Sequence, residues 1–177
     1  MGVPHLFEEP ALFIGALFSD KRILDDILPV IQDKFGNILF QSNILRWKYS
    51  DHYNKELGTP IYRIFLFFDG IIDPSTLSDI KLLTNDMEGI YSHAGKRRIN
   101  LDPGYITLAK VVLASTKNYS HRIYLGKGIY AELALLYRNR QFIPMPYTYN
   151  DYKDQTCLDM FINVRDLLKQ TQGKKAD

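Results

Sequence analysis

The 177-residue chain lacks most of the features by which a class of protein is recognised. Its single cysteine, Cys157, excludes an intramolecular disulfide and a cysteine metal cluster. No apolar run approaches the roughly 20 residues that span a bilayer. The longest runs, Ala11–Phe18 and Ile61–Phe68, have the length of strands. Acidic residues, and no basic segment, precede the first run, so no secretory signal is expected. We therefore expect a cytoplasmic protein without a membrane partner.

The chain also lacks the short motifs that mark common phosphate-binding and hydrolytic sites. It contains no GxxxxGK[ST] P-loop, no GxGxxG fingerprint, no NKxD guanine motif and no GxSxG nucleophile elbow. Neither an HxH nor an HExxH spacing is present to indicate a metal site. A ligand site in this chain would therefore consist of residues that belong to none of these standard motifs.

The chain is rich in hydrophobic and aromatic residues, which can form a core. Hydrophobic residues make up 46% of it and aromatic residues 13%, which suffices for one domain of this length. We expect residues 1–172 to form a single α+β domain and residues 173–177 to be a frayed tail.

The first hundred residues alternate strand and helix patterns. In order, they predict a buried strand, a helix capped by Ser19 or Asp20, a strand-rich segment, a central strand, a helix begun by Asp73-Pro74 and a short strand: 11–18, 21–34, 38–49, 61–68, 74–90 and 97–101. This βαββαβ order is the ferredoxin-like pattern, with two helices on one face of an antiparallel sheet.

The segment from Asp102 to Lys117 is predicted to form a third helix. Its Asp-Pro start repeats the pair that begins the preceding predicted helix. Thr107, Lys110 and Lys117 would share one face of a helix, whereas Thr107 and Lys110 would fall on opposite faces of a strand. A C-terminal hairpin around Gly126-Lys127-Gly128, a short strand and a terminal helix then complete the predicted fold.

Charge is distributed unevenly along the chain. Residues 96–140 carry nine Lys and Arg against two acids, a local charge of +7, whereas residues 1–95 carry eight bases against thirteen acids. Such asymmetry indicates an anionic partner. We therefore predict a basic pocket, built from residues 100–132, that binds and could process a phosphate-bearing small molecule such as a nucleotide.

The candidate ligand-binding residues are bases, residues at the predicted helix start or an aromatic loop residue: Gly104, Tyr105, Lys110, Lys117, Arg122 and Tyr147. Arginine offers a planar fork to a phosphate and lysine a point charge. The N-terminus of a helix offers free N–H groups to an anion. The alternative is a solvated basic face beside a loop that covers the edge of the core.

His121, Glu132 and Asp102 are the candidates for proton transfer. His121 is the histidine of the basic segment, and Glu132 and Asp102 are its two acids. Each also has a structural alternative, as a local hydrogen-bonding group, a partner for a base and a helix cap, respectively. Asp51 and Glu56 could bind Mg²⁺ bridging to a phosphate, or could belong to a polar connecting loop.

An RNA-binding module without enzymatic activity is the alternative function. It would use the same bases together with Tyr105, Tyr124 and Tyr130 on a sheet face, since single-stranded RNA stacks its bases on exposed aromatic rings.

The run NLDPGYITLAKVVLASTKNYSHRIYLGKGIYAE resembles an uncharacterised bacterial family filed as domain of unknown function 4416. The likeness extends to FIGALFS, YSDHYNKELG, IKLLTND and PYTYNDY, and so covers nearly the whole chain. Some members of that family carry the label "GTP-binding protein". The resemblance implies a soluble bacterial protein and directs attention to the same polar run. Tyr147 stands where the family pattern has Trp, which preserves an aromatic surface.

Overall fold

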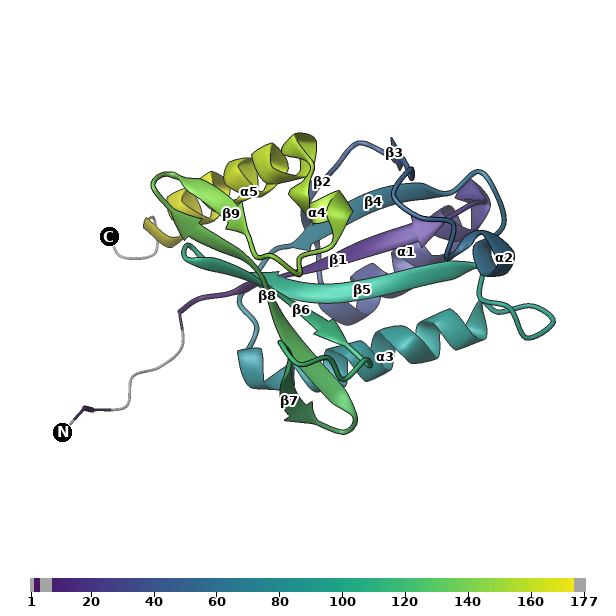
Figure 1. The fold of residues 1–177 in the computed structure, drawn as a ribbon, viewed down its shortest axis with the longest axis horizontal. Coiled ribbons are helices and arrows are strands. Elements are labelled where there is room, and N and C mark those ends of the chain that lie inside the picture. Colours follow the sequence, from purple (N-terminus) through teal and green to yellow (C-terminus); the bar gives the residue numbers. More distant parts are fainter. Residues whose placement is uncertain (1, 4–7, 174–177) are drawn as a thin grey trace.

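An antiparallel sheet runs through the molecule (Figure 1). The computed structural model describes residues 2–3 and 8–173. Within these residues the sheet has nine strands in the order β2-β4-β1-β5-β6-β8-β7, with β3 paired to β4 and β9 to β8. The strands are β1 (Ala11–Phe18), β2 (Ile38–Gln41), β3 (Leu45–Arg46), β4 (Tyr62–Phe68), β5 (Ile99–Ile106), β6 (Lys110–Ser115), β7 (Ile123–Gly126), β8 (Ile129–Arg138) and β9 (Gln141–Pro144).

Helices cover both faces of this sheet, but unequally. The described residues form α1 (Lys21–Phe35), α2 (Asn54–Leu57), α3 (Leu77–Ile90), α4 (Asn150–Lys153) and α5 (Gln155–Gly173), with a short 3-10 turn, η1 (Pro74–Thr76), leading into α3. One face carries α1 and α3, and α4 and α5 cover part of the other (Figure 1). None of the described helices combines the length and apolarity needed to cross a membrane.

Local sequence signals determine most element boundaries. The Asp20 carboxylate accepts the N–H of Arg22 at 3.0 Å and caps α1. The Asp73 carboxylate accepts the N–H of Ser75 at 2.8 Å, and Pro74 follows as the first residue of η1. The α+β class, these caps, the two central strands, the C-terminal hairpin and the terminal helix are confirmed.

The predicted third helix between Asp102 and Lys117 is wrong. This segment forms the end of β5, a turn and β6. Thr107 closes the turn: its Oγ1 accepts the N–H groups of Ala109 and Lys110, and its own N–H donates to the Lys110 carbonyl at 2.9 Å. A buried apolar run fits a helix or a covered strand equally well, so the three-residue spacing of two polar side chains misled the prediction.

Two consequences follow for the predicted anion site. The stripe of Thr107, Lys110 and Lys117 does not exist, and no helix N-terminus lies at Gly104. The strand predicted at 97–101 begins at Ile99 instead and continues through the residues assigned to that helix. Of the predicted tail, residues 174–177 lie outside the described residues.

Candidate functional site

A cleft lies beside one face of the sheet, at the point where the side chains of that face change from apolar to polar. Successive residues of a strand point to opposite faces, so residues two apart share a face. On the face that carries α5, Phe13 in β1 is followed by Gly15. On the same face of β4 and β5 lie Arg63 and Asp102, and the ion pair between them joins neighbours across Gly15. Three adjacent strands therefore present a charged floor at one end of a hydrophobic face.

The cleft opens because β5 and β6 separate. Their pairing covers only Gly104 to Ile106 of β5, and Pro103, which has no N–H to donate, stands where it stops. The peptide of Leu101, which lies beyond this pairing, hydrogen-bonds to side chains of α3 instead. Glu88 accepts its N–H at 2.6 Å, and the Lys81 ammonium donates to its carbonyl at 2.8 Å. Side chains of α3 thus reach around the free edge of β5 into the cleft.

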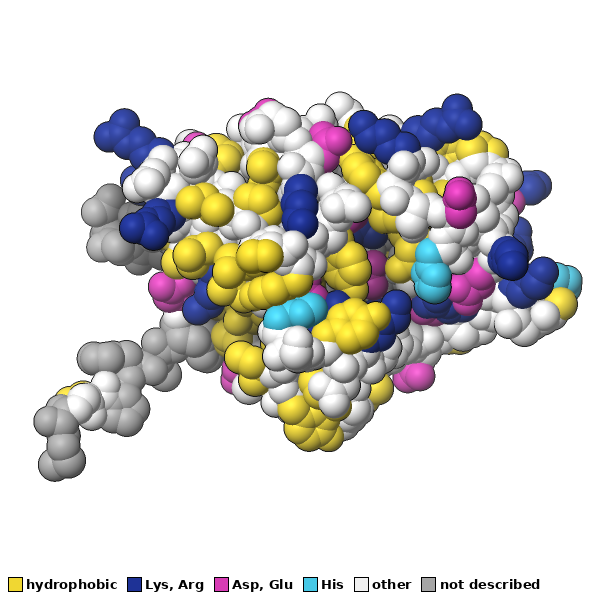
Figure 2. All heavy atoms as spheres, viewed as in Figure 1, with side chains coloured by type: hydrophobic (Ala, Val, Ile, Leu, Met, Phe, Trp, Pro, Cys, Tyr) yellow, Lys and Arg dark blue, Asp and Glu magenta, His cyan; other side chains and the backbone are white. Residues whose placement is uncertain are grey.

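The resulting cavity has a volume of about 780 Å³. It lies between α3, the loop that precedes α2, the segment of α4 and the β6–β7 connection, and its lining includes the aromatic side chains of Trp47 and Tyr53. In the space-filling view of this side of the molecule, acidic, basic and apolar side chains meet around a central hollow (Figure 2). Ligand pockets typically measure about 300–1,000 Å³, so the cleft has room for a molecule of nucleotide size.

The charge of the lining is nearly balanced. Five bases line it (Arg63, Lys81, Arg97, Lys117 and Arg122) together with four acids (Glu88, Asp102, Glu132 and Asp151). The +7 charge of residues 96–140 does not persist in three dimensions, since α3 and the segment of α4 bring acids to the same place.

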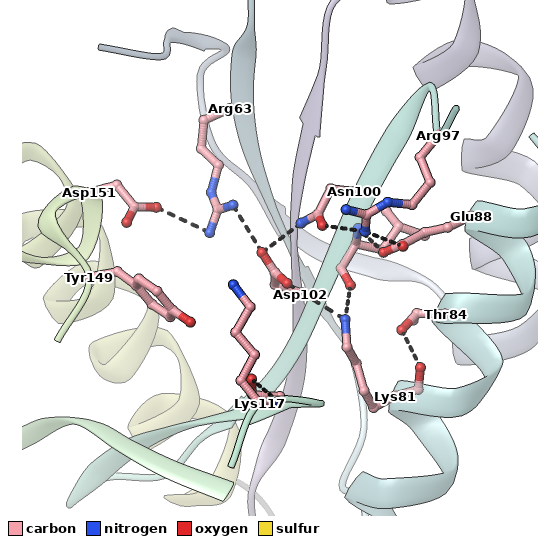
Figure 3. A network of polar contacts seen from close by, with 12 residues as sticks. Arg63, Lys81, Thr84, Glu88, Arg97, Asn100, Asp102, Lys117, Tyr149 and Asp151 are labelled. Atoms are coloured by element: carbon pink, nitrogen blue, oxygen red, sulfur yellow. Dashed lines mark hydrogen bonds and ion pairs between the residues drawn. The ribbon is translucent and has the colours of Figure 1, made fainter. Parts of the chain in front are cut away.

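Arg63 is the buried centre of the floor (Figure 3). Its guanidinium lies 3.2 Å from the Asp151 carboxylate and 3.5 Å from that of Asp102, and it donates to the Tyr152 hydroxyl at 3.1 Å. Burial opposes the charge of Arg63, but the nearby acids outweigh it and raise its pKa. Burial raises the pKa of Asp151, and Arg63 counteracts this shift. The pair joins β4 to α4 and closes one wall of the cleft.

Asp102 is held from three sides. Asn100 donates to its Oδ2 at 2.8 Å, and Lys81 lies 3.6 Å from its Oδ1, opposite the contact with Arg63 (Figure 3). The Asn100 amide is itself oriented, because its oxygen accepts an N–H of Arg97 at 2.9 Å. The carboxylate therefore has a defined position in the cleft.

Arg97 joins two helices at the rim of the cleft, through Glu56 of α2 and Glu88 of α3. It makes a bidentate contact with Glu56 at 2.6 and 2.8 Å and a third contact with Glu88 at 2.8 Å. The hydrogen bond from Arg97 lowers the pKa of Glu56. Burial raises the pKa of Glu88, and Lys81 counteracts this effect. The Arg97 guanidinium thus anchors α2 against α3.

Arg122 makes contacts with four different residues around the cleft. It contacts the Glu132 carboxylate from two nitrogens at 2.8 and 2.7 Å, the Ser115 hydroxyl at 2.7 Å, the Lys117 carbonyl at 3.0 Å and the Tyr149 hydroxyl at 2.8 Å. Four of these contacts are hydrogen bonds, and the fifth, at 2.7 Å from Glu132, is an ion-pair contact. Arg122 therefore positions the β6–β7 connection and Tyr149 around the cleft.

Lys117 extends its side chain into the cleft (Figure 3). Its backbone is fixed, because its N–H donates to Ser115 at 3.1 Å and its carbonyl accepts from Arg122. Its ammonium has no acid partner among the described residues and points toward the space between Asp102 and Tyr149. Every other base of the lining contacts at least one carboxylate.

A family model matches residues 8–167, which include every residue of the cleft lining. The chain belongs to the family described as Domain of unknown function (DUF4416). The resemblance inferred from the Asn100–Glu132 run is thereby confirmed. No curated protein and no solved structure matches the chain.

The predicted proton-transfer residues are brought together only in part. The His121 Nε2 lies 3.2 Å from the Glu132 carboxylate, and the imidazole stacks on Tyr147 with ring centroids 4.0 Å apart. Glu132 and Asp102 both line the cleft, but His121 and Tyr147 do not. His121 therefore lies behind Glu132, whose second oxygen is buried without a hydrogen-bond partner.

The remaining predicted site residues lie elsewhere or have other partners. Gly104 lies in β5, where a Cβ would come within 2.4 Å of a β6 carbonyl and 2.7 Å of Phe13, so close strand packing requires glycine there. Tyr105 packs in an apolar cluster, and Lys110 does not line the cleft. Asp51 accepts from Asn54, and no group of three or more His, Cys, Asp or Glu among the described residues is placed to hold a metal.

Several residues of the cleft floor and walls are not among the predicted site residues, including Arg63, Lys81 and Asp151. Arg63 carried a usable signal, since a charged residue inside the apolar run Ile61–Phe68 must be buried and needs a partner. Lys81 carried a similar signal, because it follows Leu77 by four residues and so lies on the apolar face of the predicted helix. Asp151 had none, because its partner is far away in the sequence.

Proposed function

We propose that the cleft binds a phosphate-bearing small molecule of nucleotide size. The observation that carries this proposal is Lys117, the base of the lining that has no acid partner among the described residues. An ammonium without a partner, held on a fixed loop inside a cleft, is a ready site for a phosphate oxygen.

Tyr149 supplies a second donor at the same place. Its hydroxyl accepts an N–H of Arg122 and so keeps its own hydrogen free to donate, and Figure 3 shows this hydroxyl directed toward Lys117. Burial raises the pKa of Tyr149, which keeps the phenol protonated at neutral pH. Lys117 and Tyr149 thus offer two donors to one anionic group.

A cleft supports a small molecule better than RNA. The tyrosines of the RNA alternative do not share one platform, because Tyr105 packs with Ala131 and Leu133 on β8, whereas Tyr130 points to the opposite face of that strand. Tyr124 is exposed and packs against Tyr130.

We also infer that β1, α1, β2, β4, α3 and β5 form a ferredoxin-like unit. Their spatial strand order β2-β4-β1-β5 and antiparallel pairing support this inference. The strands from β6 to β9 then extend the unit on the side of β5 and build one wall of the cleft.

Calorimetric titration with inorganic phosphate, sugar phosphates and nucleotides tests the binding proposal, with thermal shifts as a second readout. Lys117→Gln is expected to weaken binding of every phosphate compound about tenfold or more. Lys110→Gln removes a base from the same segment but not from the cleft, and serves as the matched control. Equal effects of the two substitutions, or no binding by the unaltered chain, would contradict the proposal.

A salt series separates the small molecule from RNA. Binding to RNA engages several phosphates, so its affinity falls steeply with salt and rises with strand length. A single phosphate group gives a shallow salt dependence. Tight binding of oligonucleotides but not of mononucleotides would favour the RNA alternative.

A further inference from the structure

We propose that the ligand of the cleft is a phosphorylated sugar, free or within a nucleotide, whose hydroxyl groups bind Asp102 while its phosphate binds Lys117. This inference rests on the proposed function and adds the chemical class of the ligand. It starts from the most accessible acid of the cleft lining.

The four acids of the lining differ in exposure. The side chain of Asp102 is 31% exposed, whereas those of Glu88, Asp151 and Glu132 are 4%, 6% and 1% exposed. The three buried acids are enclosed with Arg97, Arg63 and Arg122, respectively. Asp102 is therefore the most accessible carboxylate of the cleft lining.

Asp102 also has hydrogen-bonding capacity to spare. A carboxylate offers about four lone-pair sites. Asn100 uses one of them at 2.8 Å, and Arg63 and Lys81 stand at 3.5 and 3.6 Å, which are ion-pair rather than short hydrogen-bond distances. A hydroxyl donor would fill the remaining capacity without displacing any of these contacts.

The two cations beside Asp102 make it compatible with an anionic ligand. A lone carboxylate would repel a phosphate, but Arg63 and Lys81 both contact Asp102 and offset its charge. Lys117 points into the same space from the opposite side (Figure 3). A cation, Lys117, and a hydrogen-bond acceptor, Asp102, thus face one small volume, which suits a ligand that is anionic at one end and rich in hydroxyl groups next to it.

Phosphorylated sugars have this combination, and inorganic phosphate and alkyl phosphates do not. The same reasoning applies to the ribose phosphate of a nucleotide, for whose base the cleft lining offers aromatic side chains such as Trp47 and Tyr53. An acidic side chain that accepts ribose hydroxyls is an established element of nucleotide recognition in other folds.

The test compares ribose 5-phosphate with butyl phosphate, which carries the phosphate but no free hydroxyl group, by calorimetric titration of the unaltered chain. Ribose 5-phosphate is expected to bind about tenfold tighter or more, the size of a hydrogen bond to a charged group. This arm needs no substitution and so does not depend on the folding of a variant. Equal affinities would overturn the inference while leaving the proposed function intact.

Asp102→Asn identifies the residue responsible. This variant keeps the side-chain shape, and it is expected to abolish the preference for ribose 5-phosphate while butyl phosphate binds as before or more tightly. Lys117→Gln is expected to weaken both ligands and keep their ratio. A ratio that Asp102→Asn leaves unchanged would overturn the assignment to Asp102. Failure of all phosphate compounds to bind would instead overturn the proposed function, and the inference with it.

AMP and ribose 5-phosphate distinguish the two sources of the sugar phosphate. Tighter binding of AMP than of ribose 5-phosphate identifies a nucleotide, and the reverse identifies a free sugar phosphate. In either case the inference requires that Asp102→Asn reduce the affinity. Indifference of both ligands to that substitution would contradict it.

Discussion

One face of the sheet has two halves that differ in polarity and in what covers them. In one half, Phe13, Phe67 and Ile106 are packed beneath α5 with essentially no exposure. In the other half, Arg63 covers Gly15, and Arg63 and Asp102 line the cleft. A few residues along each strand separate the two halves.

The comparison shows how a rigid core can support a polar site. The backbone positions of charged residues on central strands are fixed by the pairing of the sheet, whereas those of loop residues must be fixed by additional contacts. Arg63 and Asp102 belong to the first kind. Lys117 belongs to the second, and Arg122 supplies the contacts that hold it.

The apolar half should respond most strongly to truncation. Phe161 of α5 is fully buried and contacts the rings of Phe13, Phe65 and Phe67. Phe161→Ala is expected to lower the free energy of unfolding by about 4 kcal/mol, through lost burial and the cavity left behind. Chemical denaturation measures this change. Asn163→Ala on the exposed side of the same helix is the control, with an expected change below about 0.5 kcal/mol.

The polar half should be nearly as sensitive when one member of its buried pair is removed. Arg63→Met leaves Asp151 buried without a cation and is expected to cost about 3 kcal/mol. Adding Asp151→Asn should restore a large part of this loss, because the uncompensated charge is then gone. Arg46→Met on exposed β3 is the control. If the double variant is no more stable than the single one, Arg63 acts by packing rather than by charge.

Two glycines sharpen the comparison at the level of backbone packing. A Cβ at Gly104 would meet a strand carbonyl at 2.4 Å, whereas one at Gly15 would meet the guanidinium of Arg63 at 2.7 Å. A side-chain end can move and a strand cannot. Gly104→Ala is therefore expected to destabilise by about 2–3 kcal/mol and Gly15→Ala by about 1 kcal/mol. Thermal unfolding of both variants gives the order, and the opposite order would contradict this account.

The smallest effect is expected at the rim and depends on pH. Arg97 lowers the pKa of Glu56, so the folded protein holds this carboxylate ionised to lower pH than the unfolded chain does. The stabilisation is present above the unfolded pKa of about 4.3 and is lost as the pH falls through the lower folded pKa. Glu56→Gln is expected to cost roughly 0.5–1 kcal/mol at pH 7, since the pair is partly exposed.

Unfolding curves at several pH values check the Glu56 prediction. The difference between Glu56→Gln and the unaltered chain should shrink as the pH falls below about 4. Glu9→Gln, which removes an acid from an exposed position, provides the comparison. A difference that stays constant with pH would show that the carboxylate charge is not what stabilises the rim.

The parts of the fold that could be predicted are those with local signals. Asp20 and Asp73 each indicate a helix that starts within a few residues, and the apolar run from Ile61 to Phe68 indicates a central strand. The segment from Asp102 to Lys117 could not be assigned in this way. Its outcome depends on the separation of β5 from β6 and on the cover supplied by α3, which no local pattern records.

The same distinction applies to the site. Lys117, Glu132 and Asp102 were found because they lie in one polar run, and all three line the cleft. The structural role of Arg122 could not be predicted. A sequence shows that an arginine is charged, but it does not show how many partners the arginine has in the fold. Asp151 and Arg63 meet only in the folded chain, so their pairing depends on how α4 docks onto β4.

The position of Trp47 has a practical consequence. It is the only tryptophan of the chain, it lines the cleft, and its indole N–H donates to the Ser50 carbonyl at 2.8 Å. Its emission can be excited apart from that of the tyrosines. A ligand beside Trp47 in the cleft would change the polarity around this single indole, so the unlabelled protein carries its own optical probe of binding.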